Sequence, residues 1–261
     1  MIGFGWALSH MAQVQRLVVL NTAAFPMPAD KPMPWQIALG RDYHKLMRNR
    51  LQKLATTLGD AFGPLGFRVF VDSAPVLERA LGRDAGLGWI GKHTCLIDRD
   101  GGSWFFLGEI YLDVPLPPDP PATAHCGSCT RCLDACPTGA RVGPRELDAT
   151  RCVSYLTIEA KGAIPEALRP LVGELLYGCD VCQEVCPYNI KFAKELTEPA
   201  FAARESLAGK DARTLARDLL QMTQEEFSAA YKGSPMKRAK LRGLKRDAAV
   251  ALGNVGTHED V

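Results

Sequence analysis

The chain has 261 residues, 47% of them hydrophobic and 23% charged, with a formal net charge of +2. These values are ordinary for a soluble globular protein, and the length allows one large core or two modest domains. No apolar run approaches the ~20 residues that a membrane span needs, and the N-terminus lacks the features of a secretory signal. Nine cysteines without an export signal indicate a reducing, cytoplasmic compartment, where thiols serve metals or catalysis rather than disulfides.

The first third of the chain predicts alternating strands and helices. Arg16–Leu20 is expected to form a buried strand, and the proline-rich stretch Pro26–Pro34 a loop. Apolar residues at helical spacing predict a long amphipathic helix over Trp35–Phe62. Phe67–Val71 then predicts a second strand and Ala74–Leu81 a short helix.

Two apolar runs on either side of Asp100-Gly101 predict a β-hairpin. The alternation of elements up to about residue 113 favours a mixed α/β layer structure. Val114–His125 contains five prolines and predicts a linker. Beyond Asn189 the chain is expected to be helical, with a capping-box pattern at Thr223 and Glu226.

The middle of the chain contains a cysteine run typical of iron–sulfur proteins. Four cysteines followed by proline give the spacing C-x2-C-x2-C-x3-C-P, at Cys126, Cys129, Cys132 and Cys136. This is the run of bacterial two-cluster ferredoxins, in which the fourth cysteine binds the other cluster. Three closely spaced thiols can surround one [4Fe-4S] cubane, and the following helix carries the fourth thiol away.

A second, incomplete run follows, with Cys179, Cys182 and Cys186 before a proline. Aligned on the proline it lacks its first cysteine, because Leu176 occupies that position. Cys152 is the one cysteine between the runs and is the natural replacement. The predicted ligands of the first cluster are Cys126, Cys129, Cys132 and Cys186; those of the second are Cys136, Cys152, Cys179 and Cys182.

Two zinc sites would also use C-x2-C pairs, but the prolines and the crossed spacing favour cubanes. Disulfides are disfavoured without secretion. The ninth cysteine, Cys95, lies in an apolar stretch and is interpreted as a buried hydrophobic residue rather than a reactive thiol.

More than 110 residues precede the first cysteine ligand, which suggests a second cofactor or a substrate site besides the clusters. Gly86–Lys92 is rich in glycine but fits neither the P-loop nor the dinucleotide fingerprint. Asp42-Tyr43-His44 begins like the D-x-H-x-x-G signature of proteins that bind cobalamin through histidine, but Met47 replaces the glycine.

Several segments, in order along nearly the whole chain, resemble the epoxyqueuosine reductase family. Those outside the cysteine runs are GRDYHK (40–45), FVDSAPVLERA (70–80), GLGWIGKHT (86–94) and GSWFFLGEI (102–110). Those that contain cysteines are HCGSCTRCLDACPTGA (125–140), RCVSYLTIE (151–159) and YGCDVCQEVCPYN (177–189).

The resemblance implies an oxidoreductase that uses cobalamin and two [4Fe-4S] clusters to reduce epoxyqueuosine to queuosine in a tRNA anticodon. It implies an α+β fold with three parts. These are a cobalamin-binding α/β domain similar to reductive dehalogenases (1–115), a ferredoxin-like two-cluster module (116–196), and C-terminal helices that open a HEAT-like repeat (197–261).

The resemblance also implies site residues. The proton-donating aspartate of the family falls on Asp72. Cobalamin-contacting positions fall on Leu107, Ile110, Ser154 and Asp180, with Asp72 beside them. From position alone, Asp72 could instead cap the following helix.

Lys232–Arg246 has seven basic residues and no acid, which suggests contact with tRNA. A solvated helix face is the competing interpretation. Bases on the first long helix, from Arg41 to Lys53, are weaker candidates. The other expected partner is an unidentified electron donor. The chain itself is expected to be a monomer that does not associate with a membrane.

By the same resemblance the chain is shorter than family members at both ends. A half-repeat at the C-terminus, standing alone, would be unable to bury its apolar stripe. Two rival functions stay open. One is a corrinoid iron–sulfur reductase of a small molecule, such as a reductive dehalogenase; the other is a ferredoxin-type electron carrier.

Overall fold

The computed structural model describes residues 16–21, 40–72, 74–117, 119–192, 199–202 and 204–257. The chain forms two compact units, each built from discontinuous segments. The first unit comprises Met1–Met27, Tyr43–Cys129 and Cys186–Leu196, and the second comprises Pro28–Asp42, Thr130–Val185 and Thr197–Val261. The three-part division into 1–115, 116–196 and 197–261 stays a prediction.

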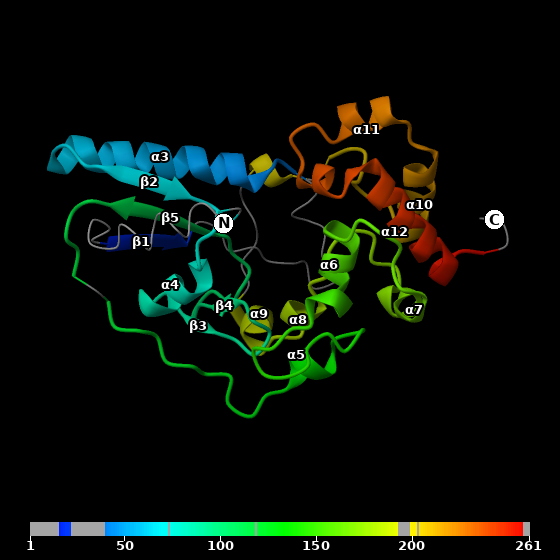
Figure 1. The fold of residues 1–261 in the computed structure, drawn as a ribbon, viewed down its shortest axis with the longest axis horizontal. Coiled ribbons are helices and arrows are strands. Elements are labelled where there is room, and N and C mark those ends of the chain that lie inside the picture. Colours follow the sequence, from blue (N-terminus) through cyan, green and yellow to red (C-terminus); the bar gives the residue numbers. More distant parts are fainter. Residues whose placement is uncertain are drawn as a thin grey trace. The chain divides into compact units, whose positions relative to one another are not determined.

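The first unit is organised around a three-stranded antiparallel sheet (Figure 1). Strand β5 (Leu107–Leu112) lies in its centre, with β1 (Arg16–Asn21) on one side and β2 (Phe67–Phe70) on the other. The register places Val19 of β1 and Phe70 of β2 on either side of Glu109. Glu109 is therefore at the middle of the central strand.

Helix α3 (Tyr43–Phe62) covers one face of this sheet (Figure 1). Its buried residues Met47 and Leu51 pack in one core cluster with Ile110 and Leu112 of β5. Gly108 permits the close approach, because a Cβ atom there would lie 2.7 Å from a methyl group of Leu51. Successive side chains of a strand point to opposite faces, so Leu107, Glu109 and Tyr111 face away from α3.

Helix α4 (Glu78–Asp84) contacts β5 and β1. The predicted helix Ala74–Leu81 is therefore present but begins four residues later. Pro75 disfavours helical backbone at Ala74, the residue before it, and so accounts for the first position of the shift. Likewise α3 begins at Tyr43 rather than Trp35; the predicted positions 35–39 and the Pro26–Pro34 loop lie outside the described residues.

The predicted hairpin around Asp100-Gly101 is partly wrong. The turn exists, since Asp98 and Gly102 exchange backbone hydrogen bonds of 2.8 and 3.1 Å. The flanking strands, however, separate: β4 (Leu96–Ile97) pairs with β3 (Trp89–Ile90), whereas β5 joins the larger sheet. Local turn signals define the reversal, but the partner of each strand depends on contacts distant in sequence.

The second unit is helical in its described part. Its α-helices are α5 (Arg131–Asp134), α6 (Val153–Ile158), α7 (Arg169–Val172), α8 (Val181–Glu184), α10 (Ala212–Gln221), α11 (Gln224–Ala230) and α12 (Lys240–Val255). The 3-10 helices are η1 (Ala149–Arg151), η2 (Glu166–Leu168), η3 (Pro199–Phe201) and η4 (Pro235–Arg238). The capping box predicted at Thr223 and Glu226 is confirmed at the start of α11. No helix among the described residues is long and apolar enough to cross a membrane.

Helix α12 buries an apolar stripe. Leu244 and Ala248 are fully buried in one cluster with Leu215 and Leu219 of α10. The expectation for a half-repeat standing alone does not apply to α12, because α10 supplies the partner surface.

Arg246 of α12 ties this helix to the segment after α6. Its guanidinium donates hydrogen bonds to the carbonyl oxygens of Leu156, Ala160 and Gly162, at 2.6, 2.5 and 2.9 Å. It also forms an ion pair at 2.7 Å with Asp247, which is fully buried. Arg246 is thus a structural residue.

We expect Arg246→Ala to destabilise the protein by about 3 kcal/mol, because removing one partner leaves the other charge buried and uncompensated. Arg242→Ala, an exposed arginine one turn earlier, is the matched control and should change stability by less than about 0.5 kcal/mol. Melting temperatures of the purified proteins measure the difference, and equal values for the two variants would contradict the structural role.

Candidate functional site: two thiol groups and a surface aspartate

The first group of thiols lies in the first unit. Cys126 and Cys129 belong to the loop before α5, and Cys186 directly precedes α9 (Pro187–Phe192). Burial raises the pKa of Cys186, and the charges of Cys126 and Cys129 raise it further. Cys186 therefore lies near thiols of the first run, although by sequence it ends the second. Cys132 is buried on α5, in the second unit.

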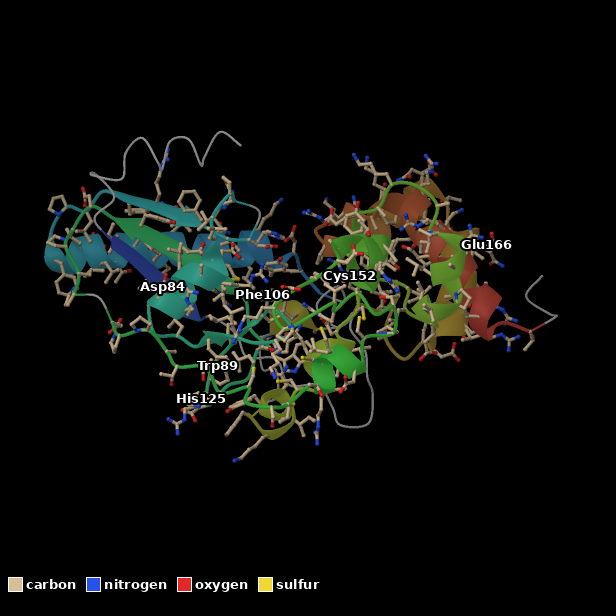
Figure 2. All side chains as sticks on the ribbon, turned by 60° about the horizontal axis from the view of Figure 1, so that its bottom comes forward. Asp84, Trp89, Phe106, His125, Cys152 and Glu166 are labelled. Carbon is tan, nitrogen blue, oxygen red and sulfur yellow. The ribbon has the colours of Figure 1, made fainter. Side chains whose placement is uncertain are left out.

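Trp89 lies against this group. Its indole N–H donates to the sulfur of Cys126 at 3.4 Å. The ring stands edge-on to Tyr188 and to His125, with centroid distances of 4.8 and 5.0 Å. Figure 2 labels Trp89 and His125. An aromatic wall and an N–H donor at sulfur are typical surroundings of an iron–sulfur cluster.

Two further contacts shape the same loop. The Lys92 ammonium donates to the carbonyl oxygens of Gly127 and Cys129, both at 2.8 Å. The buried amide of Asn189 donates to the hydroxyl of Ser103 at 2.9 Å, which links the turn before β5 to α9. Both cysteine segments of this unit are thus anchored by groups outside the cysteine runs.

The second group of thiols lies in the second unit. Burial raises the pKa of Cys179 to about 12, and nearby Cys182 and Cys152 contribute to the increase. The guanidinium of Arg141 donates to the sulfur of Cys182 at 3.3 Å. A shared neighbourhood of three thiols and one cation suits a negatively charged cluster.

Cys136 occupies an environment that favours its thiolate. Burial would raise the pKa of Cys136, but hydrogen bonds from the backbone of Arg141, Ala140 and Thr138, together with the Thr138 hydroxyl, outweigh it and lower the pKa. Iron binds cysteine as the thiolate, so this environment fits a ligand. Cys95, in contrast, is partly buried near the backbone of His93.

Asp72 lies at the protein surface after β2, with 53% of its side chain exposed. Tyr43 donates a hydrogen bond to its carboxylate, and His44 Nε2 lies 3.1 Å from the same oxygen. Its backbone is in the left-handed region, at φ 44°. Such strain in a non-glycine residue is concentrated at functional sites.

The interpretation of Asp72 as a helix cap is wrong. Helix α4 begins at Glu78, and Leu77 occupies its N-cap without a side-chain hydrogen bond. His44 of the broken cobalamin signature contacts Asp72 instead.

Two glutamates of this region, which the sequence did not single out, are removed from water: Glu109 is buried and Glu78 half-buried. Burial raises the pKa of Glu109 on β5 to about 8 and that of Glu78 on α4 to about 7. Glu109 has no exposed surface. A charged residue inside the apolar strand LGEIYL was the available signal, since such a residue is rarely buried without a reason.

The positions mapped to cobalamin differ in accessibility. Leu107 and Ser154 are half-buried, and Ile110 has no exposed surface because it packs against α3. Asp180, at the N-cap of α8, accepts a hydrogen bond from Gln183 at 3.1 Å. Burial raises the pKa of Asp180 to about 7. Ile110 therefore does not fit a direct cofactor contact in this structure.

A basic cavity of about 430 Å³ lies in the second unit, between residues 158–163 and 238–246. Three exposed cations line it and have no hydrogen-bond or ion-pair partner among the described residues: Lys161, Lys240 and Arg242. Arg238, also at the cavity, is paired with Glu159. The sequence indicated the basic helix but not Lys161, which is far away along the chain.

Two family models match the chain. One, described as a 4Fe-4S double cluster binding domain, matches residues 125–189. The other, described as epoxyqueuosine reductase QueG, DUF1730, matches residues 11–73.

Curated relatives named epoxyqueuosine reductase include one from Xanthomonas campestris, 62% identical over 86% of this chain, and one from Pseudomonas aeruginosa, 56% identical over 83%. The chain spans 62% and 59% of their lengths. A crystal structure of epoxyqueuosine reductase with an epoxyqueuosine-modified tRNA stem loop is similar, with a TM-score of 0.78 and 31% identity. This likeness covers 91% of the present chain and 64% of the other. The chain belongs to the epoxyqueuosine reductase family.

Proposed function

We propose that this chain reduces the epoxide of epoxyqueuosine in tRNA to give queuosine. The observation that carries the proposal is Asp72, an accessible carboxyl group held by Tyr43 and His44 in the same unit as one group of thiols. A solved relative holds an epoxyqueuosine-modified tRNA stem loop, which supports tRNA as the substrate. We expect a monomer in the cytoplasm, supplied by an electron donor that is unidentified.

We propose that eight cysteines bind two [4Fe-4S] clusters. The first cluster is bound by Cys126, Cys129 and Cys186. Cys132 is proposed as its fourth ligand because of its spacing in the first cysteine run. Cys186 ends the second cysteine run, but its proximity to Cys126 and Cys129 supports its assignment to the cluster of the first run. Cys136, Cys152, Cys179 and Cys182 bind the second, and the shared neighbourhood of the last three supports Cys152 as the replacement for the missing cysteine.

Cys152→Ser should remove or destabilise one cluster, because a cubane needs a thiolate at each iron. We expect iron content to fall from about eight towards four atoms per chain, with loss of one cluster signal by electron paramagnetic resonance after anaerobic purification. Cys95→Ser is the matched control and should keep both clusters. Full iron content in Cys152→Ser would contradict the assignment.

We propose cobalamin as the second cofactor, with Asp72, Leu107, Ser154 and Asp180 as candidate contacts. When bound, cobalamin supplies a strongly reducing cobalt centre that receives single electrons from the clusters. Ile110 was mapped to the same site by resemblance, but its complete burial speaks against it.

Asp72 is proposed to protonate the departing epoxide oxygen. Its half-exposed position allows a substrate to reach the carboxyl group, and hydrogen bonds from α3 orient that group. A related structure from Bacillus subtilis, 30% identical with a TM-score of 0.76, is described with its catalytic aspartate loop swung out of the active site. An exposed, strained loop position is compatible with such movement.

Asp72→Asn should keep the iron and the corrinoid spectrum but lower turnover of epoxyqueuosine-containing tRNA by about 10²–10⁴-fold, the usual contribution of a general acid. Conversion of the tRNA nucleoside, followed by mass spectrometry, measures this effect. Wild-type activity in the variant would overturn the role of Asp72. Wild-type turnover of a small halide but not of the tRNA would favour the dehalogenase-like alternative, and the absence of corrinoid bands would favour the electron carrier.

We propose that the basic cavity of the second unit contacts the tRNA backbone. Lys161, Lys240 and Arg242 are exposed cations without partners among the described residues, so each can neutralise a phosphate. Arg246 is excluded from this role because its donors are engaged within the protein.

Lys161→Glu or Arg242→Glu should weaken tRNA binding and reduce the slope of log K against log salt by about one for each lost phosphate contact. Fluorescence anisotropy with labelled tRNA at several salt concentrations measures both. Arg99→Glu, an equal charge change at an exposed site in the first unit, is the control. The same affinity and slope in all three variants would count against this surface.

A further inference from the structure

Glu109 is a buried acid without a compensating partner. Neither oxygen of its carboxyl group is hydrogen-bonded by another described residue, and the residue has no exposed surface. An ionised carboxylate in such a place is strongly unfavourable, and the usual outcome is that the group stays protonated. Burial, together with the charges of Glu78 and Asp72, accordingly raises the pKa of Glu109 to about 8.

Glu78 connects this acid to the surface. It is the first residue of α4, which contacts β5, and it interacts with Glu109. It also forms a hydrogen bond with the backbone of Asp72. One of its oxygens is buried without a partner among the described residues. Three carboxyl groups therefore succeed one another from the sheet interior to the surface: Glu109, Glu78 and Asp72.

Several titratable groups among the described residues surround the pair. Within the part of the chain that the structure describes, these are Asp72 after β2, Arg79 on α4, Tyr111 on β5 and His44 on α3. Burial and the negative charge of Asp72 outweigh the cations, so the pKa of Glu78 is raised to about 7. Near neutral pH the pair holds at least one proton.

The proposed reaction consumes more than one proton. Removing the epoxide oxygen breaks two C–O bonds and forms one C=C bond and one water molecule, with two electrons and two protons taken up. The bound clusters and corrinoid would supply the electrons. One carboxyl group at the substrate donates one proton at a time, so Asp72 must be reprotonated for the second transfer.

We propose that Glu109 and Glu78 form a buried proton store that reprotonates Asp72 during the reaction. The inference rests on the proposed function. Both glutamates act through Asp72. No hydrogen bond joins the carboxyl groups of Glu109 and Glu78 in the structure, so a bridging water molecule would carry the proton from Glu109 to Glu78 and on to Asp72. The store would refill from solvent after product release.

The sign of the pH dependence follows from the raised pKa values. The store is full below about pH 7 and empties as the pH rises through about 8. We expect turnover of the wild-type holoenzyme to fall in that range. Glu109→Gln should lower kcat about tenfold, move the alkaline decline to lower pH and leave KM for tRNA unchanged, because Glu109 is remote from solvent.

Infrared spectroscopy of the holoenzyme provides a readout that does not depend on turnover. The wild type should show a protonated-carboxyl C=O band that disappears between pH 6 and pH 10 and shifts in D₂O. Glu109→Gln should abolish this band, whereas Glu78→Gln should keep it while slowing turnover. Glu166→Gln, at an exposed site, is the control and should change neither (Figure 2). Iron content and melting temperature verify that each variant folds.

A band unaffected by Glu109→Gln, or an unchanged pH profile in that variant, would overturn the proton store while leaving the proposed function intact. Lack of wild-type activity on the tRNA, with the band present, would instead overturn the proposed function and the role of the store in it. The two failures are therefore distinguishable.

Discussion

A charge removed from water must be compensated, and this requirement governs both chemical centres of the protein. The thiols meet it with N–H donors and cations: Trp89 at Cys126, Arg141 at Cys182, and backbone amides at Cys136. Bound iron would complete the compensation. Glu109 lacks any such neighbour from another described residue, so it is neutralised by a proton. A compensated site suits a permanent ligand, whereas an uncompensated acid suits a proton that can leave.

The central strand β5 separates two tasks by the alternation of its side chains. Ile110 and Leu112 face α3 and form the hydrophobic core of the sheet. Glu109, on the opposite face, interacts with Glu78 of α4. Because β5 is the central strand, a shift of its register by one residue would turn the core residues away from α3 and move the glutamate into the core. The hydrophobic core therefore holds the acid in place.

In the second unit, one basic segment performs two physically different tasks. Arg246 satisfies three backbone carbonyls and a buried carboxylate, so its charge is used for folding. Lys240 and Arg242, within the same helix, face a cavity with Lys161 and have no partner among the described residues. A count of basic residues cannot distinguish these tasks, since both kinds of arginine look alike in a sequence. The difference lies in whether their hydrogen-bond donors are already satisfied.

The sequence by itself determined the family, the strands β1 and β2, the cap of α11 and the cysteines proposed as cluster ligands, because these depend on local spacing and residue type. Tertiary structure decided the partners of β4 and β5, the burial of α12 against α10 and the place of Lys161 in the basic cavity. It also decided which acid is buried: Asp72, which the sequence singled out, is half-exposed, whereas Glu109 lies inside. Burial is a property of what surrounds a residue, and those surroundings come from segments far apart in the chain.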